Sequence, residues 1–257
     1  MKHIFDIDII NTDCQNGICS CSDLAQGKLL TVTETIQEFY TTLITQICDK
    51  TFDTSQILFY NQMLNAKGKS DYPGAEIINM STGFRIQTDL AKAQKGENVI
   101  DLGCGAGTDC FLMGASVGVS GHVTGIDITH EMISVARLNA EQLNSENITF
   151  ILGQMESVSK PDGCADLVTS NNSIILASNK DRVLMEIFRL LKPGGRFVIS
   201  EIFATQNREH LAGSNQNLLI PSSHTLDLYT EFIDLIKMTG FNEVEILVNE
   251  SVADIKK

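Results

Sequence analysis

The stretch Val99-Ile100-Asp101-Leu102-Gly103-Cys104-Gly105-Ala106-Gly107 decides the fold of this chain. It predicts a short apolar strand that runs into a glycine-rich turn, with a helix expected over 106–118. The three alternating glycines allow turn angles that a Cβ would oppose, and they let a ligand approach the backbone closely. The start of the following helix presents free N–H groups to a carboxylate or phosphate. The stretch therefore predicts a ligand-binding turn at the end of a strand.

A second strand, Val123-Thr124-Gly125-Ile126-Asp127, follows about twenty residues later and ends in an acid. An acid at this place can accept hydrogen bonds from both ribose hydroxyls of a nucleoside. Strand, G-x-G-x-G turn, helix, strand and terminal acid together predict a nucleoside-cofactor site. The glycines alternate, whereas dinucleotide-binding folds favour G-x-G-x-x-G, so the spacing points away from a dinucleotide.

The pattern resembles the class I S-adenosylmethionine (SAM) methyltransferases, which carry [VI]-[LI]-D-x-G-x-G-x-G. That resemblance implies an α/β, Rossmann-like fold, with a mostly parallel twisted sheet and helices on both faces. It also implies that SAM is the cofactor and S-adenosyl-L-homocysteine the product. In this family the glycine turn holds the methionine part, the acid holds the ribose, and residues after the next two strands contact the adenine and the cofactor's reactive end. The cofactor-binding residues so implied are Asp101, Gly103, Cys104, Gly105, Gly107, Asp127, Ile128, Gln154, Met155 and Asn171.

Three further segments resemble the arsenite methyltransferase branch: 105–112 (GAGTDCFL), 129–133 (THEMI) and Ser170-Asn171-x-x-Ile174. The similarity covers roughly 80–245. The branch binds trivalent arsenic through cysteine thiolates, but here Phe84 and Asn172 stand at two of those places, and 205–224 has no cysteine. An aromatic ring cannot ligate a soft ion, and an amide is a poor substitute for a thiolate. We therefore expect a remodelled acceptor pocket with Phe84 and Asn172 as neighbouring walls.

Two alternatives stay open from the sequence. Cys14, Cys19 and Cys21 form a cluster that either is a tail with incidental thiols or supplies soft ligands, which would make the protein an arsenite or metalloid methyltransferase. The other alternative is a SAM-binding sensor or partner subunit without transfer activity, because no catalytic base is assigned. His224, just before the last helix, and His130 are the candidates for a base, and a plain role at a helix start fits each of them.

The chain divides into three predicted parts: an irregular cysteine-containing segment over 1–30, a helical cap over 31–95 and the SAM-binding core over 96–257. The cap begins with a helix over Thr33–Cys48, capped by Thr33 or Thr35, and a second helix is expected over 55–66. In the core, strands and helices alternate, which predicts a parallel sheet with right-handed crossovers. The strands are expected near 98–102, 122–127, 148–152, 165–170, 195–202 and 243–249, and the helices near 106–118, 130–144, 180–191 and 225–239.

The bulk composition narrows the partners. The 257 residues carry a formal net charge of −13, which disfavours nucleic acid and anionic membrane surfaces. The sequence offers no apolar run of the roughly 20 residues that a membrane span needs and no apolar core of a signal peptide at its start. Seven cysteines, mostly scattered, fit a reducing cytoplasm. We expect a cytoplasmic enzyme with a small-molecule methyl acceptor. Class I methyltransferases usually end with an antiparallel strand, but only a short polar stretch follows 243–249 here. We expect either that this strand is vestigial or that the sheet edge is covered by the N-terminal region or by a partner chain in a homodimer.

Overall fold

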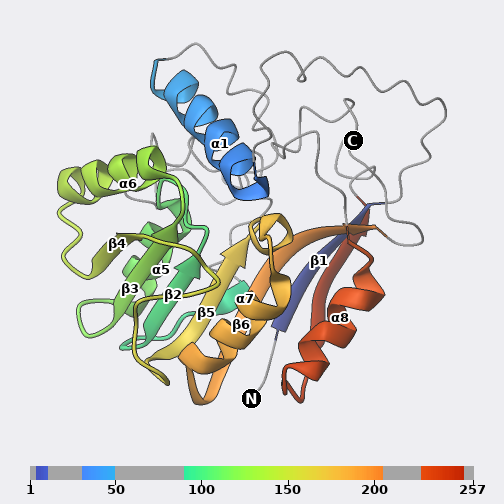
Figure 1. Cartoon of the computed structure of the whole chain (residues 1–257). Coiled ribbons are helices and arrows are strands. Elements are labelled where there is room, and N and C mark those ends of the chain that lie inside the picture. The colour runs from blue at the N-terminus through green and yellow to red at the C-terminus, as the bar shows by residue number, and fades with distance from the viewer. Residues whose placement is uncertain (1–3, 11–30, 50–89, 205–226, 252–257) are drawn as a thin grey trace, which may run out of the picture.

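A computed structural model describes residues 4–10, 31–49, 90–204 and 227–251 of the chain (Figure 1). Its centre is a seven-stranded sheet in the order β4-β3-β2-β5-β6-β1-β7, and all the pairings are parallel. The chain moves outward in one direction from β2 and in the other from β5, so ligands are expected beyond the carboxyl ends of these two strands. The strands are β1 (Ile4–Ile10), β2 (Asn98–Leu102), β3 (His122–Asp127), β4 (Ile148–Leu152), β5 (Ala165–Asn171), β6 (Leu191–Ala204) and β7 (Glu245–Ser251).

Helices cover both faces of this sheet, and Figure 1 shows α7 and α8 in front of it and α5 behind. Neighbouring residues of a strand point to opposite faces, so Val99 joins the apolar cluster with α5 and α6 while Ile100 joins the cluster with α7 and α8. The core thus has one layer on each side of the sheet, as expected for this fold class. The helices are α1 (Val32–Cys48), α5 (Thr108–Val117), α6 (His130–Gln142), α7 (Lys180–Leu190) and α8 (Tyr229–Met238), with a short 3-10 turn η4 (Ile174–Leu176).

The N-cap of the first helix lies two residues before Thr33, the nearer of the two predicted caps. Thr31, not Thr33 or Thr35, is the N-cap. Its hydroxyl accepts the backbone N–H of Glu34 at 3.2 Å, and the Glu34 carboxylate accepts the backbone N–H of Thr31 at 2.8 Å. This reciprocal pair needs a threonine three residues before a glutamate, which is the spacing of Thr31 and Glu34. The other predicted helix of the cap, at 55–66, lies outside the described residues.

The expectation of an irregular segment over 1–30 is wrong for Ile4–Ile10, which form strand β1 between β6 and β7. Isoleucine and phenylalanine fill five of these seven positions, and both residue types favour strands. Asp6 and Asp8 interrupt the apolar residues, so the strand was not recognised from the sequence. Because β1 pairs with both β6 and β7, the N-terminal residues Ile4–Ile10 join these two strands in one sheet.

The turn predicted before the fifth core strand is present as an irregularity within β6. The pairing with β5 jumps from Ala165–Leu191 to Leu167–Arg196, so the residues between Leu191 and Arg196 fall out of register. Gly194 lies there with φ +83°, a conformation that glycine adopts readily.

The described helices are all too short or too polar to cross a membrane.

Candidate functional site

The glycine-rich turn after β2 takes its shape from three glycines with positive φ, namely Gly103 (+72°), Gly105 (+52°) and Gly107 (+91°). The reason for a glycine differs between these positions. A Cβ on Gly103 would lie 2.1 Å from the Ser173 hydroxyl oxygen, so this position is closed by the protein itself. A Cβ on Gly105 would have only the Met132 sulfur nearby, at 3.9 Å. Gly105 therefore exposes its backbone to open space, as a turn that receives a ligand requires.

Asp127, at the end of β3, joins this turn. Its Oδ2 accepts the backbone N–H of Gly105 at 2.9 Å, and its Oδ1 accepts that of Thr129 at 2.8 Å. Burial raises the pKa of Asp127, although these N–H groups oppose the effect by stabilising the carboxylate. Each carboxylate oxygen can accept more than one hydrogen bond, so both keep capacity for a ligand. The acid is thus anchored by backbone on one side and faces the pocket on the other.

Asp101 lies beneath the turn and is buried. The Thr169 hydroxyl donates to its Oδ1 at 2.7 Å, and the Cys110 thiol donates to its Oδ2 at 3.4 Å. Burial, and after it the nearby Asp109 carboxylate, raises the pKa of Asp101 to about 7. The side chains of Cys104 and Cys110 pack over Gly125, where a Cβ would lie 2.9 Å from each sulfur. Asp101 and Cys104 therefore support the turn from inside the core.

A pocket of about 730 Å³, counted with its open mouth, lies beside the turn. Its walls come from the glycine turn, the end of β3, the segments after β4 and β5, and α1. Six of the residues predicted from the sequence line it: Gly103, Gly105, Asp127, Ile128, Met155 and Asn172. The other predicted cofactor residues, Asp101, Cys104, Gly107, Gln154 and Asn171, are described but are not part of its lining.

Helix α1 closes the pocket from above the carboxyl ends of the strands (Figure 1). It is fixed by two polar contacts: Gln37 donates to the carbonyl of Ile128 at 3.0 Å, and the Thr41 hydroxyl donates to the Glu131 carboxylate at 2.8 Å. Tyr40 is both buried and part of the pocket wall. Helix α1 therefore forms one wall of the pocket.

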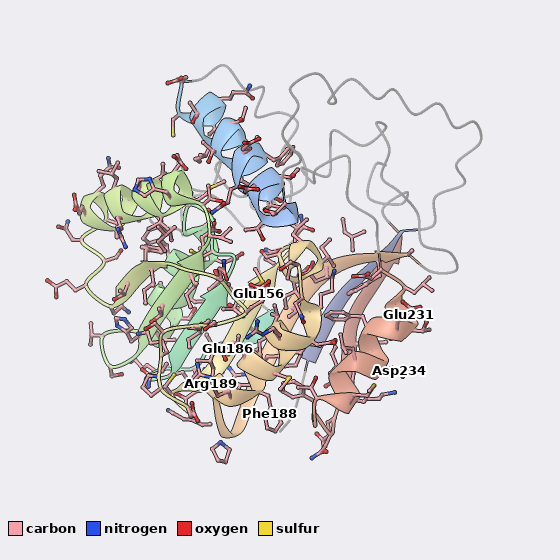
Figure 2. The ribbon with its side chains drawn as sticks, in the orientation of Figure 1. Glu156, Glu186, Phe188, Arg189, Glu231 and Asp234 are labelled. Atoms are coloured by element: carbon pink, nitrogen blue, oxygen red, sulfur yellow. The ribbon has the colours of Figure 1, made fainter. Side chains whose placement is uncertain are left out.

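Glu156 is a lining residue that sequence reasoning missed. Gln154 is exposed, whereas Glu156 lines the pocket and accepts a hydrogen bond from the Ser178 hydroxyl at 3.2 Å. In Figure 2, Glu156 lies on the side nearer to α1, away from Glu186 and Arg189. The family resemblance pointed to Gln154, the residue directly after Gly153. The only sign of Glu156 in the sequence was that a carboxylate stands two positions after Gln154.

Asn172 is the most unusual residue of the pocket. Its backbone is left-handed, with φ +56°, and its N–H donates to the carbonyl of Ser200 at 2.7 Å. The residue is only 4% exposed, and neither its Oδ1 nor its Nδ2 has a hydrogen-bond partner in the described part of the protein. A buried polar group without a partner costs about 1–3 kcal/mol. A ligand that bonds this amide would remove that cost.

Several predicted residues cannot be placed. Phe84, His224 and the cluster of Cys14, Cys19 and Cys21 lie outside the described residues. His130 is exposed at the start of α6, 3.9 Å from the Glu131 carboxylate. Across residues 4–10, 31–49, 90–204 and 227–251, no group of three or more histidine, cysteine or acidic side chains is arranged to hold a metal ion.

A profile of the methyltransferase domain family matches residues 93–238, which include the glycine turn, Asp127 and Asn172. The chain belongs to the methyltransferase domain family. An arsenite methyltransferase of Halobacterium salinarum is 46% identical over 131 residues, 51% of this chain and 34% of that protein. A demethylmenaquinone methyltransferase of Listeria welshimeri is 35% identical over 131 residues, 48% of this chain and 56% of that protein. This methyltransferase domain thus spans only part of its curated relatives.

Among solved structures, the methyltransferase domain is similar to an arsenic(III) S-adenosylmethionine methyltransferase from Chlamydomonas reinhardtii. The two are 34% identical with a TM-score of 0.50, over 59% of this chain and 54% of that one. The expected resemblance to the arsenite branch of the class I SAM methyltransferases is confirmed. The relatives include enzymes named for different acceptors, so the branch does not fix the acceptor of this domain.

The residues present fit SAM. The open backbone at Gly105 leaves room where a Cβ would otherwise stand, and the Asp127 carboxylate keeps acceptor capacity toward the pocket. Ile128 and Met155 add apolar surface. This combination of one acid and apolar walls suits a nucleoside, because the acid can accept hydrogen bonds from the ribose and the apolar walls can pack against the flat base.

Proposed function

We propose that this protein is a SAM-dependent methyltransferase that acts on a small molecule. The observation that carries the proposal is Asp127, which is anchored by the N–H groups of Gly105 and Thr129 and faces a pocket at the carboxyl end of β3. In this assignment the glycine turn at 103–107 holds the methionine part, Asp127 the ribose, and Ile128 and Met155 the adenine. When bound, SAM supplies an electrophilic methyl group on a sulfonium.

The protein's own part in the reaction is alignment and exclusion of water. Holding two reactants in line lowers the barrier because their relative freedom is lost before the reaction. Tyr40 and Ile36 of α1 cover the pocket, and Asn172 offers both a hydrogen-bond donor and an acceptor to the methyl acceptor. A base is needed only if the acceptor atom carries a proton at neutral pH. His224 is our candidate for that case.

The function is tested in two steps. Calorimetry should show SAM and S-adenosylhomocysteine binding at one site per chain, with ATP and NAD as control nucleotides that do not bind. A bacterial metabolite extract with radiolabelled-methyl SAM should then yield a labelled small molecule. If SAM binds and neither labelled product nor S-adenosylhomocysteine forms, the sensor or partner subunit replaces the methyltransferase as the function.

Replacing Asn172 by leucine is expected to lower turnover at least tenfold while SAM affinity changes less than about threefold. Leucine has the same branching at Cγ but offers neither donor nor acceptor, so the hydrogen bonds to the methyl acceptor are lost, each worth about 0.5–1.5 kcal/mol plus any group left unpaired. Turnover of the labelled product and calorimetry of SAM measure the two effects. A loss of SAM affinity equal to the loss of turnover would assign Asn172 to the cofactor instead.

Arsenite is not expected to be an efficient acceptor. Asn172 stands in the pocket where the branch has a thiolate, Phe84 replaces another, and none of the described cysteines lines the pocket. An amide oxygen binds a soft ion far more weakly than a thiolate. The assay measures arsenite-dependent conversion of SAM to S-adenosylhomocysteine with glutathione present. A conversion that disappears in a Cys14/Cys19/Cys21→Ser variant would instead support the metalloid alternative.

The cellular location and the partners of the protein are also proposals. We infer a cytoplasmic protein with no nucleic acid or membrane partner, supported by the net charge of −13. The edges of the described sheet are β4 and β7, and an unpaired edge can add a strand from another chain. A homodimer through such an edge would appear in light scattering as twice the chain mass.

A further inference from the structure

Glu201 is a fully buried acid of β6 that the proposed reaction does not use. Its Oε1 accepts two backbone hydrogen bonds, from Ser173 at 3.0 Å and from Ile174 at 2.7 Å. These two residues directly follow Asn172 in the chain. The other oxygen, Oε2, is buried and has no partner in the parts of the chain that the structure describes.

The carboxyl of Glu201 does not serve an ion pair within the described residues. Lys180, whose charge favours the carboxylate form of Glu201, forms its ion pair with Asp227 at 3.0 Å instead. A buried acid is costly unless hydrogen bonds compensate it. Within the described residues, the hydrogen bonds of the Glu201 carboxyl group all run to the short segment after Asn172. The stabilisation of this buried acid and the shape of that segment therefore depend on each other.

The segment is fixed at three points around Asn172. The N–H of Asn172 donates to Ser200, the next two N–H groups donate to Glu201, and the Ser173 hydroxyl contacts the carbonyl of Gly103 at 3.3 Å. The left-handed backbone of Asn172 is uncommon for a residue other than glycine and persists only when the surroundings impose it. Glu201 supplies two of the bonds that impose it.

We propose that Glu201 is a positioning residue for the methyl acceptor: by binding the N–H groups of Ser173 and Ile174, it fixes the side-chain amide of Asn172 in the pocket. The inference rests on the proposed function, because it assigns Asn172 to the acceptor. Glu201 does not line the pocket. It acts only through the 172–174 turn.

The test uses the full chain labelled with ²H and ¹⁵N, and it reads the side-chain amide signals of Asn172, assigned with Asn172→Asp. Glu201→Gln keeps a carbonyl oxygen for both N–H groups and should leave the Asn172 signals in place. Glu201→Leu and the one-carbon-shorter Glu201→Asp should shift or broaden them and speed hydrogen exchange at Ser173 and Ile174 at least tenfold. Glu186→Gln is the matched control, because Glu186 also accepts a backbone N–H, from Val158 at 2.7 Å, yet lies outside the pocket lining.

Each outcome decides the proposal. Unchanged Asn172 signals in Glu201→Asp or Glu201→Leu would overturn it, as would an equal change in Glu186→Gln. If Glu201→Leu does not fold, Glu201→Asp and Glu201→Gln still give the comparison between lost and retained hydrogen bonds. The readout needs neither SAM nor an acceptor. Failure of the proposed function would appear separately, as absent SAM binding by the wild-type protein in calorimetry.

Discussion

Replacing Asp127 by alanine is expected to weaken SAM binding by at least tenfold and up to about a hundredfold. The carboxylate is proposed to accept the ribose hydroxyls, and a hydrogen bond to a charged group contributes about 1.5–3 kcal/mol. The change also removes the acceptor for the N–H groups of Gly105 and Thr129, which hold the glycine turn against β3. Both effects act in the same direction, so the loss should exceed that of any single neutral contact.

Calorimetry of SAM and S-adenosylhomocysteine measures the loss. Asp127→Asn keeps one side-chain oxygen as an acceptor and should bind with intermediate affinity. Asp162→Ala is the surface control, since that side chain is 83% exposed and pairs with Arg189. Equal SAM affinity in Asp127→Ala and the wild type would exclude Asp127 as the ribose ligand.

The second large effect is a fall in stability as the pH rises from 5 to 8, caused by Glu201. Burial raises the pKa of Glu201 from an ordinary 4.5 to about 8, despite the backbone N–H groups that favour its charged form. The folded state therefore holds a proton that the unfolded chain releases above about pH 4.5. The stabilisation from this proton is complete at low pH and disappears as the pH rises through 8. By linkage the loss is on the order of 3 kcal/mol.

Glu201→Gln removes this titration. Its free energy of unfolding, relative to the wild type, should increase by about 3 kcal/mol between pH 5 and pH 8. Asp101, whose pKa is raised to about 7, lowers stability with pH in both proteins and cancels in the difference. In Glu186→Gln no such increase is expected, because hydrogen bonding to Arg189 lowers the pKa of Glu186 and its contribution is complete above pH 5. Urea unfolding followed by circular dichroism at four pH values measures these differences.

The core from β2 onward could be predicted from the sequence because each of its elements carries a local signal. Glycines at 103, 105 and 107 mark the turn, and short segments rich in valine, isoleucine and leucine mark the parallel strands β2, β4 and β5. Helix α1 shows the 3.6-residue apolar period that an amphipathic helix requires. Such signals depend on a few neighbouring residues, so they can be recognised without knowledge of the tertiary structure.

Long-range features could not be predicted in the same way. Strand β1 owes its place to pairing with β6 and β7, whose paired residues lie more than 190 residues further along the chain, as in Ile4–Val198 and Ile4–Glu245. The roles of Glu156 and Glu201 depend on which side chains face the pocket or the 172–174 turn, and a carboxylate carries no local sign of its partners. Asn172 was found because the resemblance gave its position. Its left-handed backbone and unpartnered amide became visible only in the structure.

A crystal structure of the protein with S-adenosylhomocysteine tests the central claim most directly. We expect the ribose hydroxyls on the Asp127 carboxylate, the homocysteine part along the glycine turn at 103–107, and the sulfur facing the Asn172 side chain. In the same structure, Phe84 should lie beside Asn172 on the opposite wall of the acceptor pocket. A nucleoside bound away from Asp127, or a sulfur that faces away from Asn172, would contradict the account.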